Sequence, residues 1–581
     1  MKKVTSGISL LLSCALCLSA LPAAAFATVE DNATALSDEE ASAYLEQGSD
    51  ATASGDEESV SLASSSSAQS KKTNDVISSS VDVYAYSGSD MFETAAMEAK
   101  DAYPSGSTSA IIAGPGGAWV DSLAAAGLAS AKGPILFAGD GYLPDATLDA
   151  LNSLEVKSVV IVGGEAAVSP AVATSLENNG IAVETRLAGS DCFATQMAIF
   201  NYGVENNVWC SDYVFVATYS YFADALSASP MAYSAKAPIF LVDKDGNFNE
   251  EQKKVLLEQT KKGNFKNPVA FGGTTVVSET TLGFLDSIAL FAGGSSSATR
   301  LSGDDMFGTS LAAANWAVST LGFSWNSPSV ATGYSPYDSL AGATLAGTLK
   351  SPLLLAGNSN FTTIDAAANN ASSIKELRFL GGEACITMRE RMEIADKIGF
   401  PWAAIPDFKV YVDAGHGWND TNNGAWASGA VGCGYYEADL TKELADKVAF
   451  ILKDVYGVDV YLNDDGGWYA LRHAEAISQG CDALVSIHFN AGGGTGTESL
   501  IHEYNASWLS PSWQDSIHTS LIEGTGLRDR GEKSQEVAIL GGYLPATLLE
   551  ICFIDNEDDM SQYQSRKDFI AHKIAEGIVT R

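Results

Sequence analysis

The chain is predicted to be an α/β protein in which three tandem small parallel α/β repeat modules are followed by a separate α/β domain. Three observations predict this architecture. Residues 81–404 contain one series of phrases three times, each series alternates strand-length apolar runs with alanine-rich helical segments, and all six histidines follow position 415. Alternating strand and helix patterns are typical of parallel sheets covered by helices.

Residues 1–27 are predicted to be a secretory signal peptide. Met1-Lys2-Lys3 precedes an apolar run at 8–21, and Ala25-Phe26-Ala27 supplies the small residues of a cleavage site after Ala27. A faint lipoprotein box at 11–14 is the alternative, although it would leave a very short apolar region. No later segment offers ~18 uninterrupted apolar residues, so we expect an exported protein without a membrane span.

Residues 28–80 are predicted to be a flexible, acidic, serine-rich linker. They contain eleven acidic residues against Lys71 and Lys72, and almost no aromatic residues. Such a composition buries too little apolar surface to offset the entropy of ordering the chain.

The repeats are predicted to span 81–185, 186–298 and 299–404. Each contains an opening phrase, a middle phrase and a closing apolar run with a glycine pair. The opening phrases are residues 87–94, 188–195 and 302–309. The middle phrases are 121–123, 224–226 and 338–340, and the closing runs are 159–164, 269–273 and 377–382. The glycine pairs lack the wider Gly-x-Gly-x-x-Gly pattern and a basic phosphate partner, which disfavours nucleotide binding.

These phrases resemble the cell wall-binding repeat 2 family. The resemblance implies three copies associated as a trimer-like unit, and non-covalent attachment through residues 81–404 to an anionic polymer of the cell wall. The chain departs from the family after Asp90, Asp191 and Asp305, where arginine is usual. The residues that follow here are Met91, Cys192 and Met306. Either the anionic polymer is bound differently, or the family's arginine was structural and methionine fills its place.

The net charge bears on the possible partners. A formal net charge of −37 disfavours nucleic acid and anionic lipid surfaces as partners. The same charge repels an anionic wall polymer unless lysines cluster locally or divalent cations bridge the two.

Two histidines lie in phrases that favour a metal site. His416 follows the apolar run 408–412, and His488 closes the run 483–487. Catalytic groups of parallel α/β sheets gather at the carboxyl ends of strands, so both should reach one crevice. Two imidazoles and a carboxylate such as Glu437 leave the fourth position on Zn²⁺ for water. Glu550, within a third apolar run, could then accept a proton from that water, which indicates a hydrolase.

Structural interpretations of these residues remain open at this stage. Glu550 could instead form an ion pair with Arg472 or Arg528. The other histidines have polar or charged neighbours and are predicted to be surface or satisfied core residues. They are His473, His502, His518 and His572.

Residues 405–581 resemble the zinc-dependent N-acetylmuramoyl-L-alanine amidases of the amidase-3 type. Seven phrases match in order: Asp413-Ala414-Gly415-His416-Gly417, Gly429-Ala430-x-Gly432, Glu437 at the head of a helix, Arg472 before the phrase 486–491, Gly496-Thr497-Glu498, Arg530-Gly531, and the late phrase around Glu550 and Asn556. The resemblance implies one Zn²⁺ per chain, bound by His416, Glu437 and His488, with Glu550 as the catalytic glutamate. It further implies that Asn490, Glu498 and Arg472 bind the substrate, peptidoglycan, whose amide between N-acetylmuramic acid and L-alanine would be hydrolysed.

The stretch 417–436 is longer than the family leads us to expect. It is rich in aromatic and amide side chains: Trp418, Asn419, Asp420, Asn422, Asn423 and Trp426. It either shapes the rim of the substrate groove or is an inserted surface loop. Glu437 is predicted to begin a core-facing helix, because apolar residues recur at helical spacing after it.

Six cysteines remain after the predicted signal peptide. An exported protein permits a disulfide between Cys192 and Cys210, whereas Cys481 and Cys552 are predicted to be buried free thiols. None of the cysteines has the spacing of a structural zinc site.

We therefore expect a secreted, wall-anchored peptidoglycan hydrolase. One alternative is a non-catalytic surface adhesin or scaffold in which the fold only binds ligand. Another is a zinc peptidase that cuts within the stem peptide.

Overall fold

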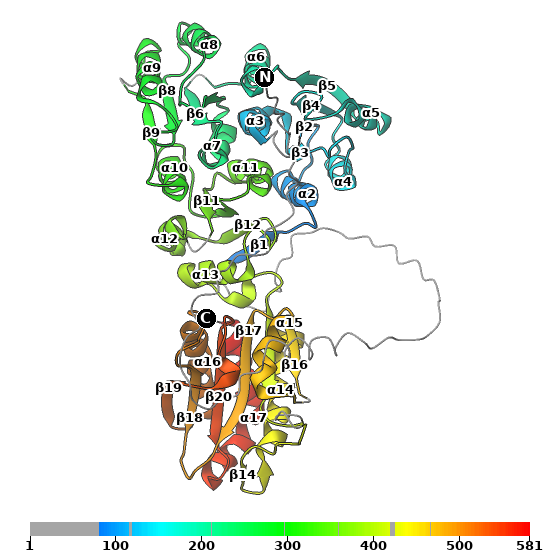
Figure 1. Ribbon diagram of the computed structural model, residues 1–581, viewed down its shortest axis with the longest axis vertical. Helices are drawn as coiled ribbons and strands as arrows, with labels where there is room; N and C mark the ends of the chain where they lie inside the picture. Colours follow the sequence, from blue (N-terminus) through cyan, green and yellow to red (C-terminus); the bar gives the residue numbers. More distant parts are fainter. Residues whose placement is uncertain are drawn as a thin grey trace, which may run out of the picture. The chain divides into compact units, whose positions relative to one another are not determined.

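The computed structural model describes residues 81–580 except 115–118, 211, 295–296, 358–359, 419–423 and 465 (Figure 1). The predicted signal peptide and linker lie outside the described residues. Within the described part of the chain, no helix combines the length and the apolar character needed to cross a bilayer.

The repeat block contains three four-stranded sheets, all parallel, as predicted. The first has the order β3-β2-β4-β5: Ile135–Phe137, Ser109–Ala113, Ser158–Val162, Ala182–Leu187. The second has the order β7-β6-β8-β9: Ile239–Val242, Tyr213–Thr218, Asn267–Phe271, Thr299–Leu301. The third has the order β11-β10-β12-β1: Leu353–Ala356, Ser329–Thr332, Glu376–Leu380, Asp82–Tyr86.

The sheets are offset by one strand from the sequence repeats. The last strand of each sheet directly precedes an opening phrase, so β9 completes the second sheet although it begins the third repeat. By the same offset β1, from the start of the block, pairs with β12 near its end. This pairing, Asp82 with Glu376 through Tyr86 with Leu380, joins segments almost 300 residues apart.

The opening phrase is a helix-capping motif. In its three copies the aspartate carboxylate accepts hydrogen bonds from backbone N–H groups of the next helix. The hydroxyl of the threonine four residues later accepts a hydrogen bond from the N–H of the phrase's glycine. An aspartate at this position satisfies N–H groups that lack a partner within the helix. The capped helices are α2 (Met91–Ala102), α6 (Cys192–Glu205) and α10 (Met306–Thr320).

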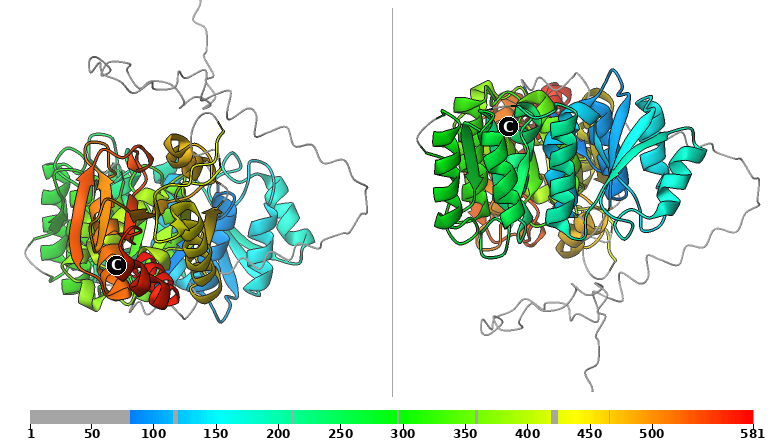
Figure 2. Two further views of the ribbon diagram at one scale, coloured as in Figure 1. Left: turned by 90° about the horizontal axis from the view of Figure 1, so that it is seen from below. Right: turned by 90° about the horizontal axis from the view of Figure 1, so that it is seen from above.

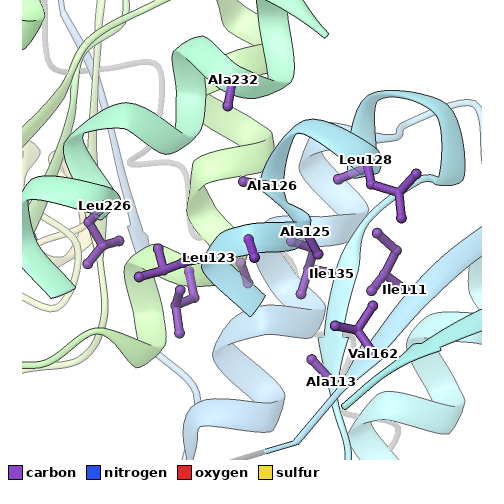
Figure 3. Close-up of a cluster of buried hydrophobic side chains, with 14 of the residues drawn as sticks. Ile111, Ala113, Leu123, Ala125, Ala126, Leu128, Ile135, Val162, Leu226 and Ala232 are labelled. Carbon is purple, nitrogen blue, oxygen red and sulfur yellow. The ribbon is translucent and has the colours of Figure 1, made fainter. Parts of the chain in front are cut away.

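The middle phrases begin three helices that pack against one another, α3 (Trp119–Lys132), α7 (Phe222–Ala235) and α11 (Tyr337–Leu349). Small side chains permit this packing. Figure 3 shows Leu123 and Ala125 of α3 between Ile135 of its sheet and Leu226 of α7. The remaining helices lie on the outer faces of the sheets: α4 (Asp145–Ser153), α5 (Pro170–Asn178), α8 (Glu250–Thr260), α9 (Glu279–Phe291), α12 (Thr362–Ala368) and α13 (Met388–Ile398).

The C-terminal domain is built on one six-stranded sheet of order β16-β13-β17-β20-β18-β19. Its strands are parallel except for the antiparallel pair β18/β20. In chain order they are β13 (Lys409–Ala414), β16 (Asp459–Asn463), β17 (Ala483–Asn490), β18 (Thr497–His502), β19 (Asp529–Gln535) and β20 (Ala546–Phe553). A small hairpin, β14 (Val431–Gly432) with β15 (Tyr435–Tyr436), precedes the first helix of the domain.

The two faces of this sheet differ. One face packs its apolar residues against α14 (Glu437–Phe450), α16 (Ser510–Thr525) and α17 (Glu557–Val579), and α16 and α17 lie side by side (Figure 2). The other face meets a smaller apolar cluster near α15 (Arg472–Ser478). Because strand side chains alternate between faces, residues 484, 486, 488 and 490 of β17 share this second face, hereafter the open face.

The predicted helix after Glu437 is confirmed. Glu437 is the first residue of α14, and Leu440, Leu444 and Val448 are buried against the sheet. All six described cysteines are free thiols. Cys481 and Cys552 are buried as predicted, and the permitted Cys192–Cys210 disulfide is absent from the described structure.

Glu98 on α2 provides a test of packing in the repeat block. Its carboxyl group is fully buried and both oxygens lack a hydrogen-bond partner among the described residues. Burial, and secondarily Asp338, raise the pKa of Glu98 well above its usual value. The equivalent positions of the other repeats are Ile199 and Ala313.

We predict that Glu98→Leu raises the free energy of unfolding by about 1–3 kcal/mol, since it removes an unsatisfied buried polar group. The gain should increase from pH 5 to pH 8. The unfolded carboxyl ionises near its ordinary pKa while the folded one stays protonated, so the wild type loses stability as pH rises. Denaturant unfolding of the full chain measures this, with exposed Glu177→Leu as the control. A pH-independent difference would contradict the assignment.

Candidate metal centre

The open face of the C-terminal sheet carries a row of polar residues. His488 on β17 is the register partner of Glu550 on β20, and Glu550 is the register partner of Glu498 on β18. The same face is apolar two residues earlier on β20, at Leu548. Along each strand the open face therefore changes from apolar core residues to polar residues of the site. His488 and Glu550 lie within their strands and not after them.

His416 reaches the same region from the loop after β13. It adopts a left-handed backbone conformation, with φ of +67°, which is uncommon for a residue with a side chain. Two glycines make room for the imidazoles. A Cβ at Gly415 would lie 2.4 Å from His488 Cε1, and a Cβ at Gly429 would lie 2.5 Å from His416 Cδ2.

Glu437 joins the two histidines. Its Oε2 lies 3.1 Å from His416 Nε2, and its Oε1 lies 3.0 Å from His488 Nδ1. Backbone N–H groups of Ala430 and Phe489 also donate to the carboxylate. Burial alone would raise the pKa of Glu437, but the two imidazoles lower it well below its usual value. Its place in the first turn of α14 further favours the charged form.

Ligand atoms of His416, Glu437 and His488 all lie within 4.8 Å of one another, and no other group of three His, Cys, Asp or Glu in the described residues does so. Ligands ~2.1 Å from a tetrahedral ion stand ~3.4 Å apart, so this spacing suits Zn²⁺. Three ligands from the protein also leave one position free, as in catalytic rather than structural zinc sites.

Glu550 is the fourth member of the site. Its Oε2 is buried and has no hydrogen-bond partner among the described residues. Burial raises the pKa of Glu550 to about 7. His488 lowers this pKa and Glu437 raises it, both by smaller amounts. A buried carboxylate without a partner is costly, which the positive charge of a metal ion in the adjacent cluster would offset.

The three residues expected to bind substrate differ in their placement. Asn490 and Glu498 lie on the open face, and Asn490 Nδ2 donates to Glu498 Oε1 at 3.0 Å. Arg472 does not line the site, because its side chain is only 1% exposed. It forms an ion pair with Asp413 at 2.8 Å and donates to the carbonyl of His416 at 3.1 Å. Its contacts indicate that Arg472 positions the chain around His416, whereas the predicted contact with substrate stays a prediction that its burial disfavours.

The network that holds this arginine was not predicted from the sequence. Asp413 is fully buried and also accepts hydrogen bonds from Asn463 and Ser486. The signal was Asp413 at the end of an apolar strand, where a carboxylate requires a partner. Arg530 was predicted only as part of a family phrase and Lys533 was not predicted; both lie on β19 and form ion pairs with Glu498.

The long loop after His416 is described only in part. Residues 419–423 lie outside the described residues, whereas Trp418 and Trp426 are 62% and 40% exposed. Trp426 packs edge-to-face on Tyr436, with ring centroids 5.5 Å apart. Aromatic side chains are therefore present at the surface between His416 and Glu437.

The geometry agrees with the family comparisons. Residues 410–580 match the N-acetylmuramoyl-L-alanine amidase family model, and residues 86–173, 186–282 and 300–389 match the model of cell wall binding domain 2. The chain therefore contains a C-terminal domain of the N-acetylmuramoyl-L-alanine amidase family and three cell wall binding domains.

Individual relatives match either most of the chain or a part of it. The N-acetylmuramoyl-L-alanine amidase LytC of Bacillus subtilis is 27% identical over 502 residues, 85% of this chain and 93% of that protein. A sporulation-specific N-acetylmuramoyl-L-alanine amidase of the same bacterium is 33% identical over 162 residues, which cover 27% of this chain and 60% of the relative. Among solved structures, Cwp6 from Clostridium difficile aligns with 23% identity and a TM-score of 0.47, over 85% of this chain and 79% of that one.

The reassignment of Arg472 in this amidase domain makes a testable prediction. Arg472→Met should lower the free energy of unfolding by about 3–5 kcal/mol, since it leaves Asp413 buried without its charged partner. The double variant Asp413→Leu/Arg472→Met should recover much of that loss. Chemical denaturation measures both variants. A single variant with unchanged stability and a raised KM would instead support the original substrate-binding assignment.

Proposed function

We propose that this protein is a zinc-dependent, cell-wall-anchored N-acetylmuramoyl-L-alanine amidase, which hydrolyses the amide between N-acetylmuramic acid and the first L-alanine of the stem peptide. One observation carries the proposal: the cluster His416–Glu437–His488 lies beside Glu550 in a domain of the amidase family. Family membership and the cell wall binding domains support the reaction and its location.

The charges of the site suit a single divalent cation. Two neutral imidazoles and the Glu437 carboxylate carry one negative charge, and Glu550 supplies a second. Zinc would supply Lewis acidity, lowering the pKa of water towards ~7 and polarising the scissile carbonyl. Glu550 Oε2, buried and without a partner among the described residues, accepts the proton of the attacking water. It then delivers that proton to the departing amine of L-alanine.

Two substitutions separate metal binding from proton transfer. Glu550→Gln should lower kcat at least ~100-fold, because the amide cannot accept a proton, and it should leave zinc near one per chain. His416→Ala should lose both zinc and turnover, because it removes a ligand. Metal analysis of the purified full chain and release of peptides from peptidoglycan measure the two effects.

His572→Ala provides the matched control, since His572 is exposed on α17 and packs on Tyr456. It should retain both zinc and turnover. Near-normal turnover of Glu550→Gln would show that another group carries the proton.

Export and wall binding are part of the same proposal. We propose that residues 1–27 direct secretion and that residues 81–404 bind an anionic wall polymer. A cavity of about 480 Å³ beside α7 is lined by Asp224, Asp304 and Asp305 together with Tyr221 and Tyr334, and no lysine or arginine is among its described lining residues. This acidic cavity is poorly suited to a polyanion.

A lysine cluster in the second repeat suits a polyanion better. It lies on α8 and the segment after it, where Lys254, Lys261 and Lys262 are exposed. The five lysines of this segment are Lys253, Lys254, Lys261, Lys262 and Lys266. Against Glu250, Glu251 and Glu258 of the same segment, the five lysines leave a local excess of two positive charges, which the acidic chain requires for such a ligand.

We predict that Lys261→Glu/Lys262→Glu weakens binding of the full chain to isolated cell walls roughly three- to tenfold, a range expected from exposed charge pairs. Added salt should weaken wild-type binding as well. Cosedimentation measures the affinity. The control, Lys157→Glu/Lys375→Glu, makes the same charge change at exposed positions outside the cluster. Equal losses in both double variants would show that net charge matters and the cluster does not.

A further inference from the structure

Two cations of β19 reach over β18, the strand next to that of the catalytic glutamate, β20. Arg530 Nε and Lys533 Nζ on β19 both contact Glu498 Oε2. Glu498 is the register partner of Glu550 on the neighbouring strand. Two positive charges therefore meet one carboxylate beside the active site, and the cluster retains an excess positive charge in a strongly acidic chain.

A β-bulge places both cations on the open face. Thr497 pairs with Asp529 and Ser499 pairs with Glu532, so β19 has one more residue than β18 in this interval. In a regular strand, residues three positions apart point to opposite faces. The extra residue brings Arg530 and Lys533 to the same side as Glu498, and bulges beside active sites commonly redirect side chains in this way.

The cations are accessible and have donors to spare. The side chain of Arg530 is 28% exposed and that of Lys533 is 31% exposed. The Arg530 guanidinium lies over the Phe553 ring, 4.8 Å from its centroid, which fixes its plane. Within the described residues, Glu498 is the one side chain that accepts a hydrogen bond from the Arg530 guanidinium, through Nε. The two Nη groups are thus available to a ligand.

The distance between this cluster and Glu550 indicates which part of the substrate the cluster can reach. Adjacent strands are ~4.8 Å apart, so the charged groups over β18 lie about one strand spacing from Glu550. An extended peptide advances ~3.3–3.6 Å per residue, which places the cluster one to two residues from the scissile bond. The lactyl carboxyl of N-acetylmuramic acid is consumed in that bond, so the peptide is the part of the substrate with a free carboxylate at this reach.

We propose that Arg530 and Lys533 form a subsite for a carboxylate of the substrate peptide, one to two residues beyond the scissile amide. This subsite rests on the amidase function proposed above. Glu498 holds the two cations together and is itself held by Asn490. Arg530, with its planar pair of free donors, provides the bidentate contact that carboxylates favour.

Two soluble probes test the subsite. They are N-acetylmuramoyl-L-alanyl dipeptides that differ only in a free carboxylate or a carboxamide on the residue after L-alanine. The wild-type full chain should cleave the carboxylate probe with a KM roughly tenfold or more below that of the carboxamide probe, because hydrogen bonds to charged groups are strong. Arg530→Gln/Lys533→Gln should abolish this preference and leave kcat within about twofold, since neither residue touches the reacting atoms.

Lys447→Gln is the matched control. Lys447 is 34% exposed and pairs with Asp568 among the helices of the other face, so its variant should keep the wild-type preference. Equal KM values for the two probes with the wild-type enzyme would overturn the subsite while leaving the amidase function in place. A preference for the carboxylate probe that survives in Arg530→Gln/Lys533→Gln would also overturn the subsite. If the wild type releases L-alanyl peptide from neither probe, the proposed function fails and the subsite fails with it.

Discussion

The buried ion pair between Asp413 and Arg472 sets the geometry on which the active site depends. Asp413 is the penultimate residue of β13, and its partner Arg472 also donates to the carbonyls of Ala414 and His416. These contacts hold the chain where it leaves the sheet in a left-handed conformation. His416 can therefore face His488 and share the Glu437 carboxylate. A buried ion pair is weak evidence of net stability, but removing one partner leaves an uncompensated buried charge and is strongly destabilising.

Charge is distributed unevenly in the molecule, and the few clusters of positive charge lie where we propose that anionic ligands bind. The chain is strongly acidic, yet lysines gather on and after α8, and two cations of β19 contact Glu498, the register partner of Glu550. One group suits a wall polymer and the other suits an anionic peptide. Holding a hydrolase on its insoluble substrate raises the effective concentration of scissile bonds near the site, so wall binding by the repeats would favour turnover without any contact to the reacting atoms.

Much of this arrangement could be predicted from the sequence, where local patterns carry the information. His416 and His488 follow apolar runs, and a parallel sheet brings strand ends together, so their convergence was predictable. The burial of Arg472 was not predictable, because an arginine in a sequence indicates a positive charge but does not indicate that Asp413 is its buried partner. Long-range pairing was equally inaccessible. The union of β1 with β12 and the bulge that aligns Arg530 with Lys533 depend on register between distant strands, for which no local residue pattern exists.

The identity of the scissile bond tests the central claim most directly. Purified full-length protein would be incubated with peptidoglycan, with and without a chelator, and the products identified by mass spectrometry. We predict chelator-sensitive release of intact stem peptides that begin with L-alanine, together with glycan chains whose muramic acids carry free lactyl carboxyl groups. Shortened peptides still attached to the glycan would contradict the amidase assignment and indicate a peptidase instead.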